Sequence, residues 1–117
     1  MPVAELLVEA AKAERYARSL PKHFARKVEV ESAGGGNLVR FPMGTCHIEH
    51  AGQELRFRCE ADAGDKLQTV IGIVSAHVLR LGELRGRTIT WTHADGATQE
   101  IDASIFEQFS NRHDSKP

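Results

Sequence analysis

The sequence predicts an α+β domain: an antiparallel sheet of about six strands, two main helices packed on one face, and a C-terminal hairpin arm followed by a short helix. Apolar residues fall at every second position in several short segments separated by glycine-containing turns, which is typical of half-buried strands. In two longer segments they recur at three- and four-residue steps, which is typical of amphipathic helices. The strand positions between the apolar residues are mostly charged, so we expect helices to cover only one face of the sheet.

The first segment allows two interpretations. Composition favours one helix from residue 4 to residue 20, and the alternating pattern of residues 3–9 is a weaker signal for a strand. Later in the segment one apolar stripe recurs at helical steps, formed by Ala13, Tyr16, Ala17, Leu20 and Phe24. Pro21 has no backbone N–H, so we expect a kink or a fresh helical turn at this residue.

Two hairpins are expected next. The first joins strands at residues 27–32 and 38–41 through a glycine-rich tip, and Pro42 ends its second strand. The second occupies residues 45–60, and two registers keep its apolar residues on one face. A two-residue loop sets Cys46 opposite Phe57, whereas a four-residue loop sets Cys46 opposite Cys59; the second register is slightly favoured because Ala-Gly is a poor hairpin turn.

Residues 66–84 form the strongest helical pattern, with Gly82 near its end. The side chains expected to face away from the core are Gln68, Thr69, Ser75, Ala76 and Arg80. A strand at residues 87–92 then enters a hairpin with a three-residue loop, which sets Ile89 opposite Ile101. A capping box starting at Ser104 predicts a short helix, and residues 110–117 are expected to fray.

Length and composition indicate one cytoplasmic domain spanning residues 1–117. The chain has 41% hydrophobic residues, enough for one core, and no apolar run long enough for a membrane span. Its formal charge of −1 argues against bulk attraction to nucleic acid. The two cysteines lack metal-type spacing and are expected to be free thiols in a reducing compartment.

Several short motifs, in this order, resemble a small bacterial family known as domain of unknown function 2218. They are Arg15-Tyr16-Ala17, His23-Phe24 before a basic residue and a Val-x-Val strand, Phe41-Pro-Met-Gly44-Thr-Cys46, a long helix holding His77, and Ile89-Thr-Trp91. The resemblance covers residues 3–92, leaving 93–117 as an extension, and Pro21 departs from the family pattern. It implies that residues 3–9 form a strand, which we adopt. It also implies a weak link to iron handling, because the family is similar to a domain joined to siderophore-interacting flavin reductases.

His23 and His77 lie at corresponding margins of the two helical stripes, so their imidazoles meet if both helices pack side by side on the sheet. Cys46 also points into that core. A set of two His and one Cys would suit zinc, iron or a haem iron. The plainer interpretation is that each His caps a neighbouring polar group and Cys46 is a small buried hydrophobe.

A second candidate site is the basic face of the first helix. It consists of Lys12, Arg15, Arg18, Lys22 and Arg26. This face suits an anionic ligand, RNA or an acidic protein, although no interleaved aromatic residue supports base stacking. The plainer interpretation is a solvated helix surface.

The sequence therefore favours a non-enzymatic binding or accessory protein. The family resemblance adds a link to iron or siderophore metabolism, with a flavin reductase as partner. The first alternative is a metal- or haem-binding redox protein that uses His23, His77 and Cys46. The second is a self-associating subunit that forms a homo-oligomer through Ile105, Phe106 and Phe109, an apolar set that needs a surface to cover it.

Overall fold

A computed structural model describes residues 2–104 of the chain. The strands are β1 (Val3–Glu9), β2 (Glu29–Ala33), β3 (Gly36–Phe41), β4 (Gly44–Ala51), β5 (Glu54–Ala61), β6 (Ile89–His93) and β7 (Thr98–Ile101). The helices are α1 (Ala13–Phe24), α2 (Gly64–Val78) and a short 3-10 helix, η1 (Gly82–Leu84).

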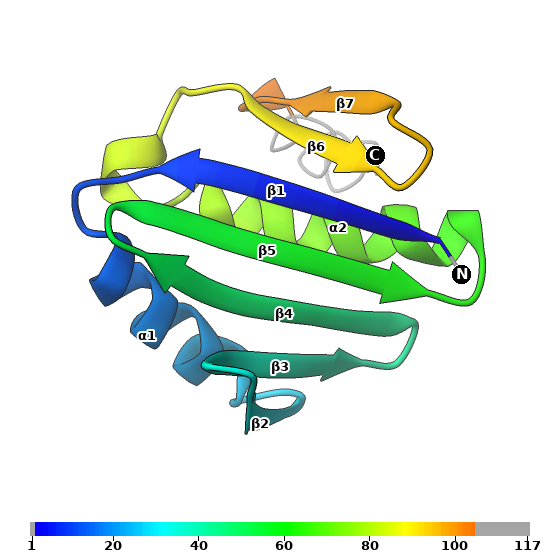
Figure 1. Ribbon diagram of the computed structural model, residues 1–117, viewed down its shortest axis with the longest axis horizontal. Helices are drawn as coiled ribbons and strands as arrows, with labels where there is room; N and C mark the ends of the chain where they lie inside the picture. The colour runs from blue at the N-terminus through cyan, green and yellow to red at the C-terminus, as the bar shows by residue number, and fades with distance from the viewer. Residues whose placement is uncertain (1, 105–117) are drawn as a thin grey trace, which may run out of the picture.

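The seven strands form one antiparallel sheet in the order β2-β3-β4-β5-β1-β6-β7. Helix α1 packs mainly against β3, β4 and β5, and α2 packs against β4, β5 and β1. Both helices lie behind the same face of the sheet (Figure 1). The α+β class, the one-sided helix layer and the added hairpin arm are thus confirmed, with β7 as the arm.

Strand β1 settles the ambiguity of the first segment in favour of the extended conformation. It lies between β5 and β6 and pairs with both. Its alternate residues Ala4, Leu6 and Val8 are buried, whereas the side chains between them point to the open face. Pairing on both edges and burial of every second residue outweigh the helical propensity of Ala, Leu and Glu in this segment.

Helix α1 runs without interruption through Pro21, so the alternative of a fresh helical turn is wrong. The Pro21 ring is buried, and its carbonyl accepts a hydrogen bond from Ala25 N at 2.9 Å. A residue far away in the sequence fixes the turn before α1. The carboxylate of Glu83 accepts hydrogen bonds from Ala11 N at 2.8 Å and Lys12 N at 2.7 Å. Glu83 therefore places a negative charge near the N-terminus of the helix.

The β4–β5 hairpin has the favoured register, with Cys46 opposite Cys59. Pairing continues to Ala51 and Glu54, so the turn contains only Gly52 and Gln53 and is shorter than the four-residue loop expected. Gly52 has φ +60°, a left-handed conformation that glycine adopts at little cost. This turn lets the two strands pair over their full length.

Helix α2 ends at Val78, six residues before the expected end at Leu84, and η1 follows it. The outward orientation expected for Ser75 is also wrong. Ser75 is fully buried, and its Oγ accepts a hydrogen bond from Trp91 Nε1 at 2.8 Å. Ala76, also expected to face away from the core, is buried as well.

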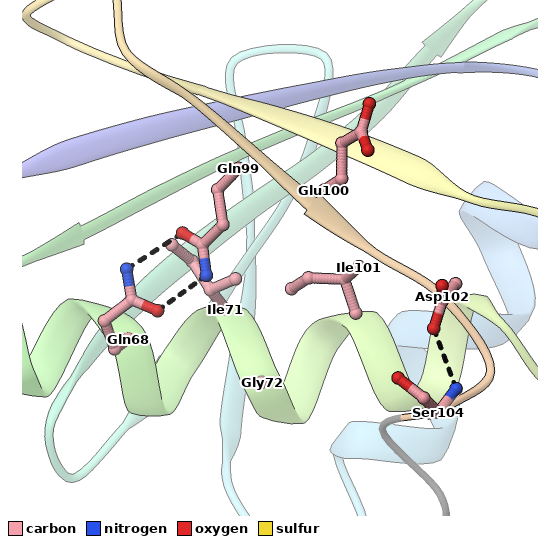
Figure 2. A pocket seen from close by; sticks show the side chains of 8 residues that line it. All are labelled: Gln68, Ile71, Gly72, Gln99, Glu100, Ile101, Asp102 and Ser104. Atoms are coloured by element: carbon pink, nitrogen blue, oxygen red, sulfur yellow. Dashed lines mark hydrogen bonds between the residues drawn. The ribbon is translucent and has the colours of Figure 1, made fainter.

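The β6–β7 hairpin has the predicted register, with Ile89 opposite Ile101. Gln68 of α2 and Gln99 of β7 exchange two side-chain hydrogen bonds, of 2.8 and 2.7 Å. This pair, drawn in Figure 2, lies beside a hollow of about 350 Å³ that Ser104 also lines. These bonds tie the edge strand to the helix layer. The predicted short helix, the surface formed by Ile105, Phe106 and Phe109, and the frayed residues 110–117 lie outside the described residues.

The open face of the sheet carries charged side chains that pair with one another. Arg40 and Glu31 form a cross-strand ion pair of 2.6 Å, and Arg58 contacts Glu60 at 3.1 Å and Glu5 at 3.7 Å. Within residues 2–104, no helix is long and apolar enough to span a membrane.

Candidate functional site

A groove of about 460 Å³ lies between the C-terminal end of α1, the β3–β4 turn and α2. Its walls are mainly apolar and are formed by Phe24, Val28, Phe41, Met43 and Ile73. His23, His77, Arg26 and Lys27 also line it. A second hollow of about 270 Å³ adjoins the same two histidines and reaches Leu20 and Arg80. The imidazoles are therefore shared by two neighbouring hollows along the α1–α2 boundary.

The two histidines meet as the helical stripes predicted. The His23 and His77 ring centroids are 5.0 Å apart, with an interplanar angle of 59°. Phe24 lies 4.6 Å from the His77 ring and 5.3 Å from the Phe41 ring, the latter edge-to-face. Four aromatic rings from α1, α2 and β3 thus form one cluster at the groove.

Hydrogen bonding fixes the neutral tautomer of His77. Its Nδ1 lies 2.8 Å from the carbonyl oxygen of Ile73, one turn earlier in α2. A carbonyl can only accept a hydrogen bond, so Nδ1 carries the proton and Nε2 holds the lone pair of the neutral ring. The pKa of His77 lies below its usual value, chiefly because the ring is half-buried and also because His23, Arg80 and Lys27 are close. The neutral ring therefore presents an acceptor at Nε2.

Cys46 lies elsewhere in the core. It is fully buried in β4 opposite Cys59, and both thiols are free. The pKa of the Cys59 thiol is raised, first by its hydrogen bond with Cys46 and then by burial. Among residues 2–104, no three His, Cys, Asp or Glu side chains lie close enough together to hold a metal ion. Of the expected metal ligands, His23 and His77 thus meet at the groove, and Cys46 does not line it.

The electrostatic character of the groove is positive. No Asp or Glu of the described chain lines either hollow, whereas Arg26, Lys27 and Arg80 do. Within that part of the chain, neither Arg26 nor Lys27 forms an ion pair. All five residues of the basic face are exposed, but Arg18 pairs with Glu14 at 2.8 Å and only Arg26 lines the groove.

The sequence prediction missed the wall opposite the histidines. Phe41 and Met43 flank Pro42 at the β3–β4 turn, and Lys27 and Val28 follow the end of α1. Phe41-Pro-Met is an apolar turn, which is unusual for a loop and is the signal from which this wall could have been found. Because this turn is far from His77 in the sequence, the sequence pattern did not indicate that both line the same groove.

The solved NMR structure of PA4090 from Pseudomonas aeruginosa has a similar fold. The match has a TM-score of 0.67 and 23% sequence identity, and it covers 79% of this chain and 96% of that one. No curated protein matches the chain. Residues 6–92 match DUF2218, described as uncharacterized proteins conserved in bacteria. The match extends over most of the residues that carry the resemblance and includes both histidines and the Phe41–Gly44 turn, and the chain therefore belongs to the DUF2218 family.

Proposed function

We propose that this protein is a non-enzymatic binding domain that holds a small organic anion with an apolar body in the groove beside His23 and His77. The observation that carries the proposal is that one groove combines apolar walls with two cationic side chains, Arg26 and Lys27, which form no ion pair with another described residue. Small-molecule sites are typically concave and mostly apolar, with a few polar groups that orient the ligand. A volume of about 460 Å³ is within the usual range for such sites.

The charges favour an anion over a cation. Arg26 and Lys27 supply positive charge without a carboxylate beside them among the described lining residues. Phe24, Phe41 and Met43 offer the apolar surface that an alkyl or aryl group would cover. An inorganic anion would use only the cationic part of this surface, so the proposal specifies an organic anion.

The test is a titration of the ¹⁵N-labelled protein, followed by amide chemical shifts. Benzoate and octanoate serve as anionic ligands, and benzyl alcohol and benzylamine serve as neutral and cationic controls. The anions are expected to shift the amides of Phe24, Phe41, Met43 and Ile73 more than the controls do. Equal shifts by all four compounds, or no shifts, would contradict the proposal.

A matched pair of variants separates the groove from the rest of the basic face. Lys27→Gln removes a groove cation and should weaken benzoate binding about two- to fivefold, the usual effect of a single partly exposed charge. Lys12→Gln removes an exposed cation at the other end of α1 and should leave benzoate binding unchanged. The opposite ranking would place the anion on the helix face.

The link to iron or siderophore metabolism, with a flavin reductase as partner, rests on the family resemblance and forms a separate part of this proposal. Affinity capture from a bacterial lysate tests it, with the Phe41→Ala variant as the control for groove-dependent binding. Failure to recover a flavin reductase would remove this part and leave the ligand-binding proposal unchanged.

A metal- or haem-binding redox protein is a second candidate, favoured by the 5.0 Å separation of the His23 and His77 rings. Imidazole nitrogen is a common ligand of zinc and iron, but Arg26 and Lys27 disfavour a free cation at this groove. Titration with Zn²⁺, Fe²⁺ or haem, followed by histidine ¹⁵N resonances, tests it. Unchanged His23 and His77 resonances would eliminate this candidate.

A further inference from the structure

We infer that the organic anion bound in the groove also carries a hydroxyl group, and that this hydroxyl donates a hydrogen bond to Nε2 of His77. The ligand class is then an aromatic hydroxy acid. Its ring packs against Phe24 and Phe41, and its carboxylate lies toward Arg26 and Lys27. This inference rests on the proposed function and names the chemistry that selects the ligand.

The first step of the argument is that the neutral His77 ring offers an acceptor and no second donor. Its only N–H, at Nδ1, is already bonded to the Ile73 carbonyl. Turning the ring over would break that bond, and the ring is packed against Phe24 and His23 at centroid distances of 4.6 and 5.0 Å. A carboxylate is also an acceptor, so it forms no hydrogen bond with His77 in this state.

The second step is that Nε2 is accessible to solvent. It makes no hydrogen bond to another described residue. Within residues 2–104, however, no buried side-chain nitrogen or oxygen lacks a partner. Since His77 is only half-buried, its Nε2 must reach solvent, and the ring lines both hollows. A donor on a bound ligand can therefore replace water at this atom.

The third step is that the groove offers two kinds of polar partner to a ligand, cationic side chains and a neutral hydrogen-bond acceptor. The carboxylate is attracted to Arg26 and Lys27, which follow α1, and the neutral acceptor is on α2. These three residues line the groove together with its apolar wall. A ligand that satisfies both needs an anionic group and a hydrogen-bond donor on one apolar body. A flat ring suits that body, because the wall contains the edge-to-face pair Phe24–Phe41 at 5.3 Å.

The lone pair of Nε2 could equally coordinate a metal ion, and a carbonyl partner at Nδ1 is common in metal-binding histidines. Charge distinguishes the two readings. Arg26 and Lys27 repel a cation, and the described lining contains no carboxylate or thiolate to complete a coordination shell. The groove therefore fits a hydroxyl donor better than a bare divalent ion.

The experiment compares benzoate with its 3-hydroxy and 4-hydroxy derivatives, and with the 3-methoxy and 4-methoxy derivatives as controls that keep an oxygen and lack the donor. Dissociation constants come from amide shifts at the groove. At least one hydroxybenzoate should bind about three- to tenfold more tightly than benzoate, which is the usual net effect of one hydrogen bond, and its methoxy analogue should show no gain. The His77 Nε2 resonance of the wild-type protein should move with the hydroxybenzoate and stay fixed with benzoate.

Two variants assign the preference to His77. His77→Phe keeps a ring against Phe24 and deletes Nε2, so it should retain benzoate affinity and lose the preference for the hydroxyl. His23→Phe replaces the neighbouring, exposed imidazole and should keep that preference. A preference lost in His23→Phe and kept in His77→Phe would overturn the assignment.

The outcomes distinguish the hydroxyl inference from the proposed anion-binding function on which it rests. If benzoate and the hydroxybenzoates shift the groove amides with equal affinity and leave Nε2 unmoved, the hydroxyl inference is wrong and the anion-binding function stands. If no compound shifts the groove amides, both are wrong. If Nε2 responds to Zn²⁺ and to no hydroxybenzoate, the hydroxyl inference is overturned in favour of a metal.

Discussion

Trp91 Nε1 donates a hydrogen bond of 2.8 Å to Ser75 Oγ in the middle of the core, where both side chains are fully buried. This bond joins β6 to α2 and gives the indole N–H a partner that water cannot supply at this depth. Ser75 is the one buried polar residue of the described core. Its contribution to the stability of the fold therefore depends on its hydrogen bond with Trp91.

Ser75→Ala should lower the free energy of unfolding by about 1–3 kcal/mol, because it leaves the buried indole N–H without an acceptor. Urea denaturation followed by tryptophan fluorescence and circular dichroism measures the change. Ser19→Ala, at an exposed position of α1, is the control and should have little effect. A double-mutant cycle with Trp91→Phe should give a clear coupling energy, and additive effects would contradict the role of the bond.

The stability of the protein should fall as the pH drops below about 6.5, the ordinary pKa of histidine, because the pKa of His77 is lowered in the folded state. Between that lowered value and 6.5 the unfolded chain binds the proton more readily, so acid favours unfolding through this group. The contribution is fully present above this window. Denaturation at a series of pH values measures it.

His77→Phe should flatten the dependence on pH in that window, because it removes the titrating ring and keeps an aromatic side chain. His50→Phe, at an exposed position of β4, is the control and should keep the slope. An unchanged slope in His77→Phe would show that other groups cause the acid effect.

Glu83→Gln should lower the melting temperature at neutral pH and reduce the loss of stability in acid. The pKa of Glu83 is lowered in the folded state, first by its hydrogen bond from Lys12 N and then by that from Ala11 N. The stabilisation is therefore present above the ordinary pKa of 4.5 and is lost as the pH falls through the lower folded value. Thermal melts at neutral and acid pH measure both effects. Equal behaviour of Glu83→Gln and the exposed control Glu100→Gln would contradict this role.

Two glycine substitutions should change stability in opposite directions. A Cβ at Gly44 would clash with the Glu60 carbonyl oxygen, so Gly44→Ala should destabilise by about 1–3 kcal/mol, as overpacking does. A Cβ at Gly72, inside α2, meets nothing within 4 Å, so Gly72→Ala should stabilise by about 0.5–1 kcal/mol. Urea denaturation of both variants decides the matter, and a stabilising Gly44→Ala would disprove the close approach.

The thiols of Cys46 and Cys59 should resist alkylation in the native protein and react fully in denaturant. Both are buried, and the raised pKa of Cys59 lowers its thiolate fraction further. Mass spectrometry after iodoacetamide treatment counts the labelled thiols. Rapid labelling of either one under native conditions would show that the β4–β5 pair opens locally.

Local periodicity was sufficient to predict several parts of this fold. The alternation of residues 45–60 set which side chains face the core, and together with turn chemistry it favoured the register that pairs Cys46 with Cys59. The three-residue loop 94–96 likewise set Ile89 opposite Ile101. The helical positions of His23 and His77 predicted that their rings meet on condition that the two helices pack side by side. Each of these features depends on spacing within one or two elements.

Features that depend on distant neighbours were decided only by tertiary structure. The sequence by itself determined the faces of the strands and helices and the margin of each helix on which His23 and His77 lie. Packing decided that β1 is a strand, because β5 and β6 supply its hydrogen bonds, and that Ser75 is buried, because Trp91 supplies its partner. It also closed the groove with Phe41 and separated Cys46 from the histidines. Periodicity describes which way a side chain points, and only the assembled layers determine what it meets.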